Sequence, residues 1–179
     1  MKILKYLLFA VIGIVALVLI VALFVDGNYA VEREITVNKP KQEVFDYVKY
    51  LKNQDNFSVW AQMDPDMKKD FKGTDGQVGA ISSWESERDD VGKGEQEIIK
   101  IEEGKRVDYE LRFIEPFEAK DNAYMATEAL DSTKTKVKWG FNGKMQYPMN
   151  TMLLFMDMEQ MLGSQLDSGL INLKAVLEK

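Results

Sequence analysis

The stretch ITVNKPKQEVFDYV, residues 35–48, decides the fold, because it joins a strand directly to an amphipathic helix. Residues 31–37 (VEREITV) alternate their side chains with a period of two, as a half-buried strand does. Asn38 can cap the following helix, and Pro40 fits its first turn. One face of that helix then collects the apolar side chains of Val44, Phe45, Val48 and Leu51. The sequence therefore predicts a strand that leads without a long loop into a short helix.

Downstream of this helix the chain has the pattern of an antiparallel meander. Residues 106–115 are the clearest strand, since Val107, Tyr109, Leu111 and Phe113 alternate with charged residues. Turn residues at 103–104 and 131–133 separate this strand from its neighbours. We expect about six antiparallel strands between residues 78 and 145. Residues 64–79 are polar and contain glycine, so we expect a loop there.

A long helix is expected to end the chain, over residues 150–177. Its strongest apolar stripe consists of Leu162, Leu166, Leu170, Leu173 and Leu177. Gly163 and Gly169 each weaken such a helix by up to about 1 kcal/mol relative to alanine. They are expected to mark a bend or a close approach to the sheet.

Two segments carry a resemblance to a known superfamily: residues 35–48 with Trp60 after them, and residues 169–178 (GLINLKAVLE). Over about residues 31–178 the chain resembles the SRPBCC superfamily, also called START-like or helix-grip proteins. Within it, the polyketide cyclase/dehydrase-like group is the most similar. The resemblance implies an α+β helix-grip fold, in which a curved antiparallel sheet wraps around a long C-terminal helix.

The same resemblance implies a deep apolar cavity that binds lipids, sterols, polyketides or other hydrophobic molecules. A few members of the superfamily catalyse cyclisation or dehydration, and others act as transfer proteins, receptors or co-chaperones. No single catalytic motif unites them, so no catalytic residue can be assigned from the resemblance.

The N-terminus is expected to be a transmembrane helix over residues 1–26, followed by a linker at 27–30 and the helix-grip domain at 31–179. Residues 7–25 contain no charge, and as a helix they would span about 28 Å, close to the thickness of a bilayer core. A cleaved signal peptide is the alternative, but its apolar region is usually about 7–15 residues long. Lys2 and Lys5 favour a cytoplasmic N-terminus, which places the domain outside the cytoplasm.

Composition excludes several classes of site. The chain has no His and no Cys, so zinc fingers, disulfides and Ser-His or Cys catalytic centres are ruled out. Its 23 basic residues are outnumbered by 29 acidic ones, which argues against nucleic acid as a partner. We expect no cofactor and no metal.

Candidate ligand-binding residues follow from the inward faces of the expected strands and helix. We expect the cavity to be lined by Trp84, Tyr109, Leu111, Phe113, Trp139, Phe141, Met145, Met152, Phe155 and Leu162. Six of the ten methionines lie between residues 145 and 161. Because methionine is flexible and common at adaptable surfaces, this segment is interpreted as a pocket wall, as core filling, or as an end that faces the bilayer and admits a lipid.

The leading hypothesis is a membrane-anchored, non-catalytic binding protein for a hydrophobic small molecule or lipid, which contacts the bilayer through residues 7–25. One alternative is a cyclase- or hydratase-like enzyme, which would need a titratable side chain in the cavity. Tyr109 or a glutamate would have to serve, and Glu85, Glu87, Glu95 and Glu97 are the candidate carboxylates. Another alternative is a protein-interaction module, chaperone-like, in which the cavity is merely core.

Overall fold

The structure is a computed structural model that describes residues 2–88 and 90–179. It opens with helix α1 (Lys2–Ala22) and strand β1 (Asn28–Val37), followed by three short helical segments: α2 (Lys41–Val48), η1 (Leu51–Asn56) and α3 (Val59–Gln62). Six strands come next: β2 (Lys68–Lys72), β3 (Ile81–Glu85), β4 (Lys93–Glu102), β5 (Arg106–Glu115), β6 (Ala119–Ala129) and β7 (Thr135–Lys144). The chain ends with η2 (Met149–Leu154) and α4 (Met158–Leu177). The predicted start of the N-terminal helix at residue 1 lies outside the described residues.

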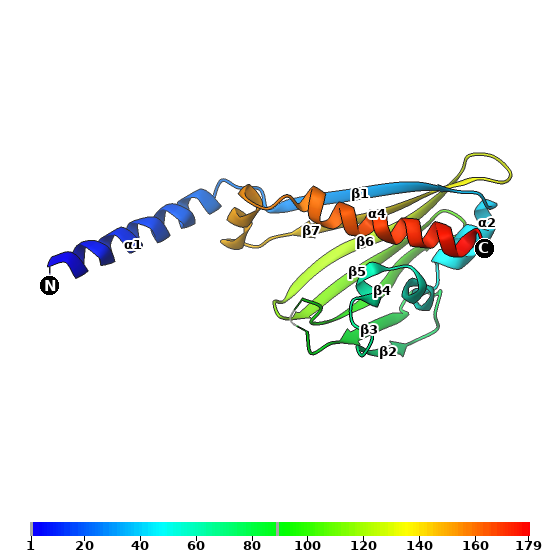
Figure 1. Cartoon of the computed structure of the whole chain (residues 1–179), viewed down its shortest axis with the longest axis horizontal. Helices are drawn as coiled ribbons and strands as arrows, with labels where there is room; N and C mark the ends of the chain where they lie inside the picture. The colour runs from blue at the N-terminus through cyan, green and yellow to red at the C-terminus, as the bar shows by residue number, and fades with distance from the viewer. Residues whose placement is uncertain (1, 89) are drawn as a thin grey trace.

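All seven strands form one antiparallel sheet in the order β1-β7-β6-β5-β4-β3-β2. The first and last strands of the chain are neighbours, with Asn28 opposite Lys144 and Val37 opposite Thr135. The sheet curves, and α4 lies across its hollow face beside β1 (Figure 1). This is the α+β helix-grip architecture that the sequence predicted.

Helix α4 packs on the sheet through Leu166, Leu170, Leu173 and Leu177, all of them buried. Its two glycines mark close approaches. A methyl group on Gly163 would collide with the guanidinium of Arg33, which forms ion pairs with Glu159 (2.5 Å) and Asp167 (3.0 Å) of the same helix. A methyl group on Gly169 would lie 2.6 Å from the ring of Trp139. The helix therefore accepts the lower propensity of glycine where the sheet comes nearest.

The half of the interior next to the C-terminus of α4 is solidly packed. Helix α2 fills it with Val44, Phe45 and Val48, none of which is exposed. The side chain of Tyr109 is buried in the same half, and its hydroxyl donates a hydrogen bond to the Val48 carbonyl (3.3 Å). Burial raises the pKa of Tyr109 far above its ordinary value, so this phenol stays neutral.

Two boundaries differ from the prediction because local capping interactions override the apolar pattern. The expected helix over 150–177 is broken after η2, and α4 begins only at Met158, where the Asp157 carboxylate accepts a hydrogen bond from the Gln160 amide (2.9 Å). At α2 the cap position is Pro40, whereas the Asn38 amide donates to Glu178 at the end of α4 (2.5 Å).

Two strands extend into segments expected to be irregular. Strand β1 begins at Asn28, inside the predicted linker at 27–30, because it continues its pairing with β7 down to Lys144. Strand β2 lies within the predicted loop at 64–79. It is an edge strand with four of its five residues exposed, so it has no apolar alternation that the sequence could show.

Helix α1 is long and apolar enough to cross a membrane, and its residues 3–20 are exposed, whereas Ala22 at its end is buried. In Figure 1 it extends away from the domain. The helix ends at Ala22, short of the predicted end at residue 26. The Asn150 side-chain amide donates hydrogen bonds to the Ala22 and Val25 carbonyls there (2.8 and 2.7 Å). Its end is thus held by η2.

Candidate ligand-binding cavity

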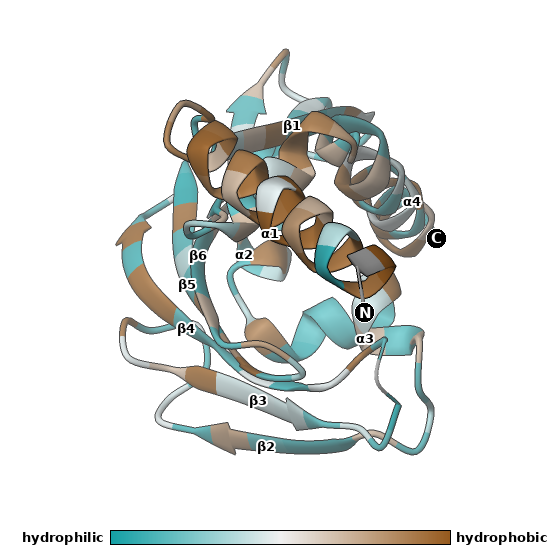
Figure 2. Ribbon diagram, turned by 90° about the vertical axis from the view of Figure 1, so that its left-hand side faces the viewer, coloured by the Kyte–Doolittle hydropathy of each residue, from teal (hydrophilic) through white to brown (hydrophobic). Residues whose placement is uncertain are grey.

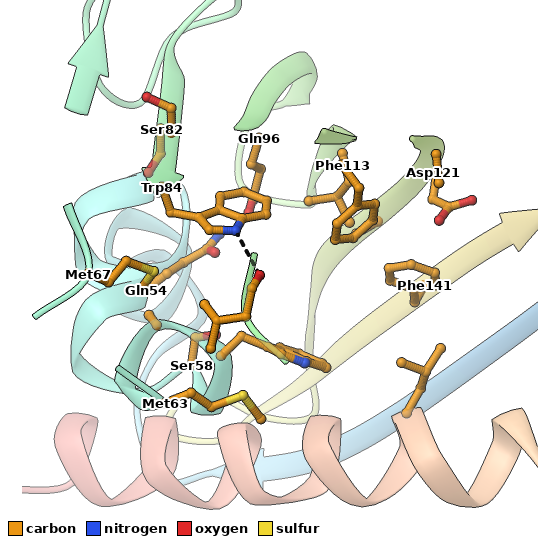
Figure 3. Close-up of a pocket in the computed structure, with 18 of the residues that line it drawn as sticks. Gln54, Ser58, Met63, Met67, Ser82, Trp84, Gln96, Phe113, Asp121 and Phe141 are labelled. Atoms are coloured by element: carbon orange, nitrogen blue, oxygen red, sulfur yellow. Dashed lines mark hydrogen bonds between the residues drawn. The ribbon is translucent and has the colours of Figure 1, made fainter. Parts of the chain in front are cut away.

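A cavity of about 430 Å³ occupies the other half of the interior. Its walls are the hollow face of the sheet, the first half of α4, and the segment from η1 through α3 (Figure 3). This volume falls within the range of about 300–1,000 Å³ that is usual for sites that take small molecules. Helix α2 packs against one part of the hollow face of the sheet and fills the space there. Over the other part, η1 and α3 line the cavity and leave space between themselves and the sheet.

Aromatic side chains make up much of the cavity wall. All three tryptophans of the chain line it. The rings of Trp60 and Trp139 meet edge to face with centroids 5.8 Å apart, and those of Trp84 and Phe113 do so at 6.0 Å. Such a wall offers a large apolar surface in a fixed geometry, which suits a hydrophobic ligand.

The η1 segment contributes a buried amide to the cavity. Gln54 is only 9% exposed, and its side-chain Nε2 makes no well-formed hydrogen bond, although it lies close enough to the Tyr109 hydroxyl to oppose the rise in the pKa of that group. Figure 3 shows Gln54 pointing into the same space as Trp84. Ser58, also buried, lines the cavity one turn further along the chain. An unpaired buried donor is costly, and a ligand with an acceptor oxygen would satisfy it.

Replacing Gln54 by leucine, which has a similar volume, is expected to leave the free energy of unfolding unchanged or to raise it by about 1 kcal/mol. The substitution removes an unsatisfied donor while it keeps the wall filled. The same variant should lose affinity for a fatty acid more than for the corresponding hydrocarbon. Thermal denaturation and titration of both probes would check this, with exposed Gln62→Leu as the control. A clear loss of stability would contradict it.

A carboxyl group also faces the cavity. Asp121 on β6 is 5% exposed, and its Oδ1 accepts a hydrogen bond from the Lys144 amide (3.0 Å). Burial raises the pKa of the Asp121 carboxyl, partly opposed by that hydrogen bond. The neighbouring Tyr29 has its pKa raised to about 12, through burial first and the charge of Asp121 second. The cavity wall is therefore mainly apolar, and Asp121 is the buried one among the four acidic residues that line it, the others being Asp55, Asp90 and Glu115.

Asp121→Asn is expected to stabilise the chain at neutral pH. The pKa of Asp121 is higher in the folded state than in the unfolded state, so protonated Asp121 favours folding. This contribution to the free energy of unfolding is fully present below the unfolded pKa. It is lost as the pH rises through the folded pKa. Asparagine does not ionise, so its advantage should be largest at pH 7 and vanish toward the ordinary carboxyl pKa of about 3.9. Melting temperatures against pH would measure it, with exposed Glu128→Gln as the control. A constant difference across the pH range would refute the prediction.

The cavity reaches the surface at the end of the domain where α1 joins β1. There β7 ends beside the start of β1 (Lys144 opposite Asn28), and β6 starts beside the end of β5 (Ala119 opposite Phe113). The loop after β5 lines the cavity at this end with Pro116 and Phe117. Phe117 is 78% exposed, so the lining here is continuous with the outer surface.

The structure brings six of the ten sequence-predicted residues together around the cavity: Trp84, Leu111, Phe113, Trp139, Phe141 and Leu162. The other four lie elsewhere. Tyr109 is on the same strand face as Leu111 but falls in the half that α2 fills. Met145 directly follows β7 and does not line the cavity, whereas Tyr29, whose ring lies over Gly143, does. Met152 and Phe155 are 39% and 89% exposed, because the break before α4 turns them outward.

The residues that sequence reasoning missed come mainly from η1, α3 and the two strand ends nearest α1: Tyr29, Gln54, Ser58, Trp60, Met63, Met67 and Asp121. Trp60 lies in the segment that carries the family resemblance, but the resemblance gave it no place in the cavity. The others carry no periodic pattern. Their places follow from how η1 and α3 stand over the sheet, which depends on tertiary contacts.

The candidate carboxylates on β3 and β4 lie away from the cavity. Arg112 forms ion pairs with Glu95 (2.6 Å), Glu97 (2.8 Å) and Glu110 (2.6 Å) on the outer face of the sheet. Hydrogen bonds to these carboxylates raise the pKa of Arg112. Lys93 forms an ion pair with Glu85 (3.0 Å) and is the main cause that lowers the Glu85 pKa. These groups act as surface ion pairs.

The architecture and the cavity define a helix-grip domain. The sequence matches no protein-family model and no curated protein sequence. Solved structures match its fold. Norcoclaurine synthase from Thalictrum flavum, in complex with a transition-state analogue, has 10% identity and a TM-score of 0.59 over 84% of this chain and 94% of that one. The Aha1 dimer from Colwellia psychrerythraea has 13% identity and a TM-score of 0.56, over 84% and 96%. Ara h 8.0201 has 16% identity and a TM-score of 0.56, over 84% and 98%.

At these identities the likeness shows the fold alone. The helix-grip fold is confirmed, whereas membership of the SRPBCC superfamily stays a prediction. The polyketide cyclase/dehydrase-like subgroup stays a prediction, and so does the binding role of each cavity residue. An enzyme and Aha1 share this one architecture, so the function has to be argued from the cavity.

Proposed function

We propose that the chain is a membrane-anchored binding protein for a hydrophobic small molecule or lipid. The observation that carries the proposal is the cavity of about 430 Å³, whose wall is built mainly from aromatic and aliphatic side chains. Gln54, Ser58 and Asp121 are its buried polar groups. This combination favours an amphipathic ligand, with a hydrocarbon body and at least one oxygen that can accept a hydrogen bond.

The anchor in this proposal is α1. Its 21 residues would span about 30 Å as a helix, which matches the hydrocarbon core of a bilayer. The described part of the chain leaves residues 3–20 of this helix exposed, so the helix needs an apolar environment from outside the domain. The N-terminal lysines favour a cytoplasmic N-terminus, which supports a domain outside the cytoplasm in this proposal.

The test is native mass spectrometry of the full-length chain released from detergent micelles, followed by solvent extraction of whatever co-purifies. We expect a stoichiometric apolar adduct that solvent removes. A bare mass, together with no uptake from a total lipid extract, would overturn the binding proposal. Alkaline extraction of membranes tests the anchor separately, because a spanning helix keeps the chain in the pellet and a cleaved leader leaves it in the supernatant.

A second candidate function is the cyclase- or hydratase-like enzyme, favoured by one observation. Asp121 supplies the titratable group in the cavity that this function requires, in place of Tyr109. Mass analysis of the molecule before uptake and after release would decide between the two functions. Conversion by the parent chain and its loss in Asp121→Asn would establish catalysis, whereas release of an unchanged molecule would establish binding alone. The interaction-module alternative, in which the cavity is merely core, would be favoured by a filled core with an exposed apolar patch, and the cavity of about 430 Å³ argues against it.

A further inference from the structure

Next to the end of α1 the chain carries a second apolar segment, which the cavity does not use. Residues 145–156 (MQYPMNTMLLFM) contain no charged side chain. Several of their large apolar groups are exposed, with Phe155 at 89%, Leu154 at 56% and Met149 at 52%. We call the exposed side chains at this end the apolar rim: Leu23, Phe24, Tyr147, Met149, Met152, Leu154 and Phe155.

Hydrogen bonds fix the apolar rim to α1. Besides the two bonds from Asn150 to the Ala22 and Val25 carbonyls, the Tyr147 hydroxyl donates to the Leu19 carbonyl (3.3 Å). Ala22 is only 2% exposed at this joint. The rim therefore surrounds the point at which the helix leaves the domain, as Figure 1 shows for η2.

Water is a poor environment for this surface. Clusters of exposed large apolar groups on a soluble face usually mark a contact with another protein or with a membrane. Here the rim lies next to the apolar surface of α1. The segment from Tyr147 to Met156, which supplies most of the rim, contains no charged residue. This continuity favours one occupant, the bilayer that α1 would cross, over a separate protein partner.

The cavity opens at the same end. Phe117 lines the cavity and is 78% exposed. It follows β5, and the strand ends there lie beside those of β7 and β1, next to the joint with α1. Figure 2 looks at this end of the domain along the direction from which α1 approaches. The rim and the opening therefore face the same way.

We propose that the apolar rim lies in the interfacial layer of the membrane, so that the cavity opens toward lipid and takes its ligand directly from the bilayer. The inference rests on the proposed anchor, since α1 brings the rim to the membrane. It adds a defined orientation of the domain and a route for the ligand. Methionine, phenylalanine and tyrosine side chains suit this layer, in which apolar groups insert beside the headgroups.

The absence of cysteine makes the test clean, because a single introduced thiol can be labelled. The full-length chain would carry cysteine at one of three positions: Leu17→Cys in α1, Phe155→Cys in the rim, or Leu130→Cys in the turn after β6 at the opposite end. Each variant is labelled with an environment-sensitive fluorophore and placed in phosphatidylcholine nanodiscs. Quenching by nitroxide-bearing lipid and by aqueous iodide is then compared.

We expect the labels at positions 17 and 155 to be quenched by nitroxide lipid and protected from iodide at least threefold relative to position 130. If position 155 is as open to iodide as position 130 while position 17 is protected, the anchor stands and the rim proposal is wrong. If position 17 is also open, the anchor fails and the rim proposal falls with it. Protection of position 155 without lipid quenching would indicate a second protein copy on the rim and would also overturn the proposal.

Discussion

Phe141→Asp is expected to weaken uptake of a fatty acid at least tenfold while the chain stays folded. Phe141 lies on β7, lines the cavity and stacks on Tyr29 with ring centroids 6.1 Å apart. The position is only partly buried, so a carboxylate there can reach water in the empty cavity. An apolar ligand would strip that water away, and such desolvation costs several kcal/mol, of which about 1.4 kcal/mol already corresponds to tenfold.

The cavity supplies its own reporter for this experiment. Because all three tryptophans line it, dibrominated stearic acid should quench the intrinsic fluorescence on binding, and unbrominated stearic acid should not. Ile171→Asp is the matched control, since Ile171 is 60% exposed on the outer side of α4. Far-ultraviolet circular dichroism checks the fold. Equal affinities for Phe141→Asp and Ile171→Asp would show that the fatty acid binds elsewhere.

Trp139→Ala is expected to lower the free energy of unfolding by about 3–5 kcal/mol. Trp139 is 6% exposed, and its ring meets Phe57 edge to face at 5.6 Å and lies against Gly169. Alanine removes these contacts and enlarges a cavity that is already open, so the walls have little means of collapsing. A charged residue at this position, unlike one at Phe141, should unfold the chain.

Urea denaturation of the full-length chain in a mild detergent would measure this effect. Phe155→Ala is the control, because it deletes an aromatic ring that is 89% exposed, and it should change the free energy of unfolding by less than about 0.5 kcal/mol. A loss below 1 kcal/mol for Trp139→Ala would mean that the wall around it can repack. The assigned cavity shape would then be wrong.

Much of the fold could be predicted because its elements have strong local patterns. The strand and helix within residues 31–48, the alternation along β5 and the leucine stripe of α4 all appear as expected. Where the local pattern is weak, prediction failed. Strand β2 is almost entirely exposed, and the break before α4 depends on one capping contact of Asp157.

The candidate site was only partly predictable, for a different reason. Alternation shows which face of a strand points inward, but not how far along that face the filled core ends. Tyr109 and Leu111 share a face, and α2 covers the first and leaves the second open to the cavity. Gln54 and Asp121 belong to the cavity through the placement of η1 and the sheet edge. No local pattern in the sequence encodes that placement.

The connection between α1 and β1 is short, with only residues 23–27 between Ala22 and Asn28. Even fully stretched, five residues reach about 18 Å, and the Asn150 bonds hold them closer than that. With α1 as the proposed anchor, so short a connection would keep the domain at the membrane surface. The domain could then diffuse in the plane of the membrane but could not carry a ligand across a compartment. Transfer of the bound ligand to another site would then need an acceptor that reaches the anchored domain. The search for a physiological partner should therefore begin among soluble carriers and proteins of the same membrane.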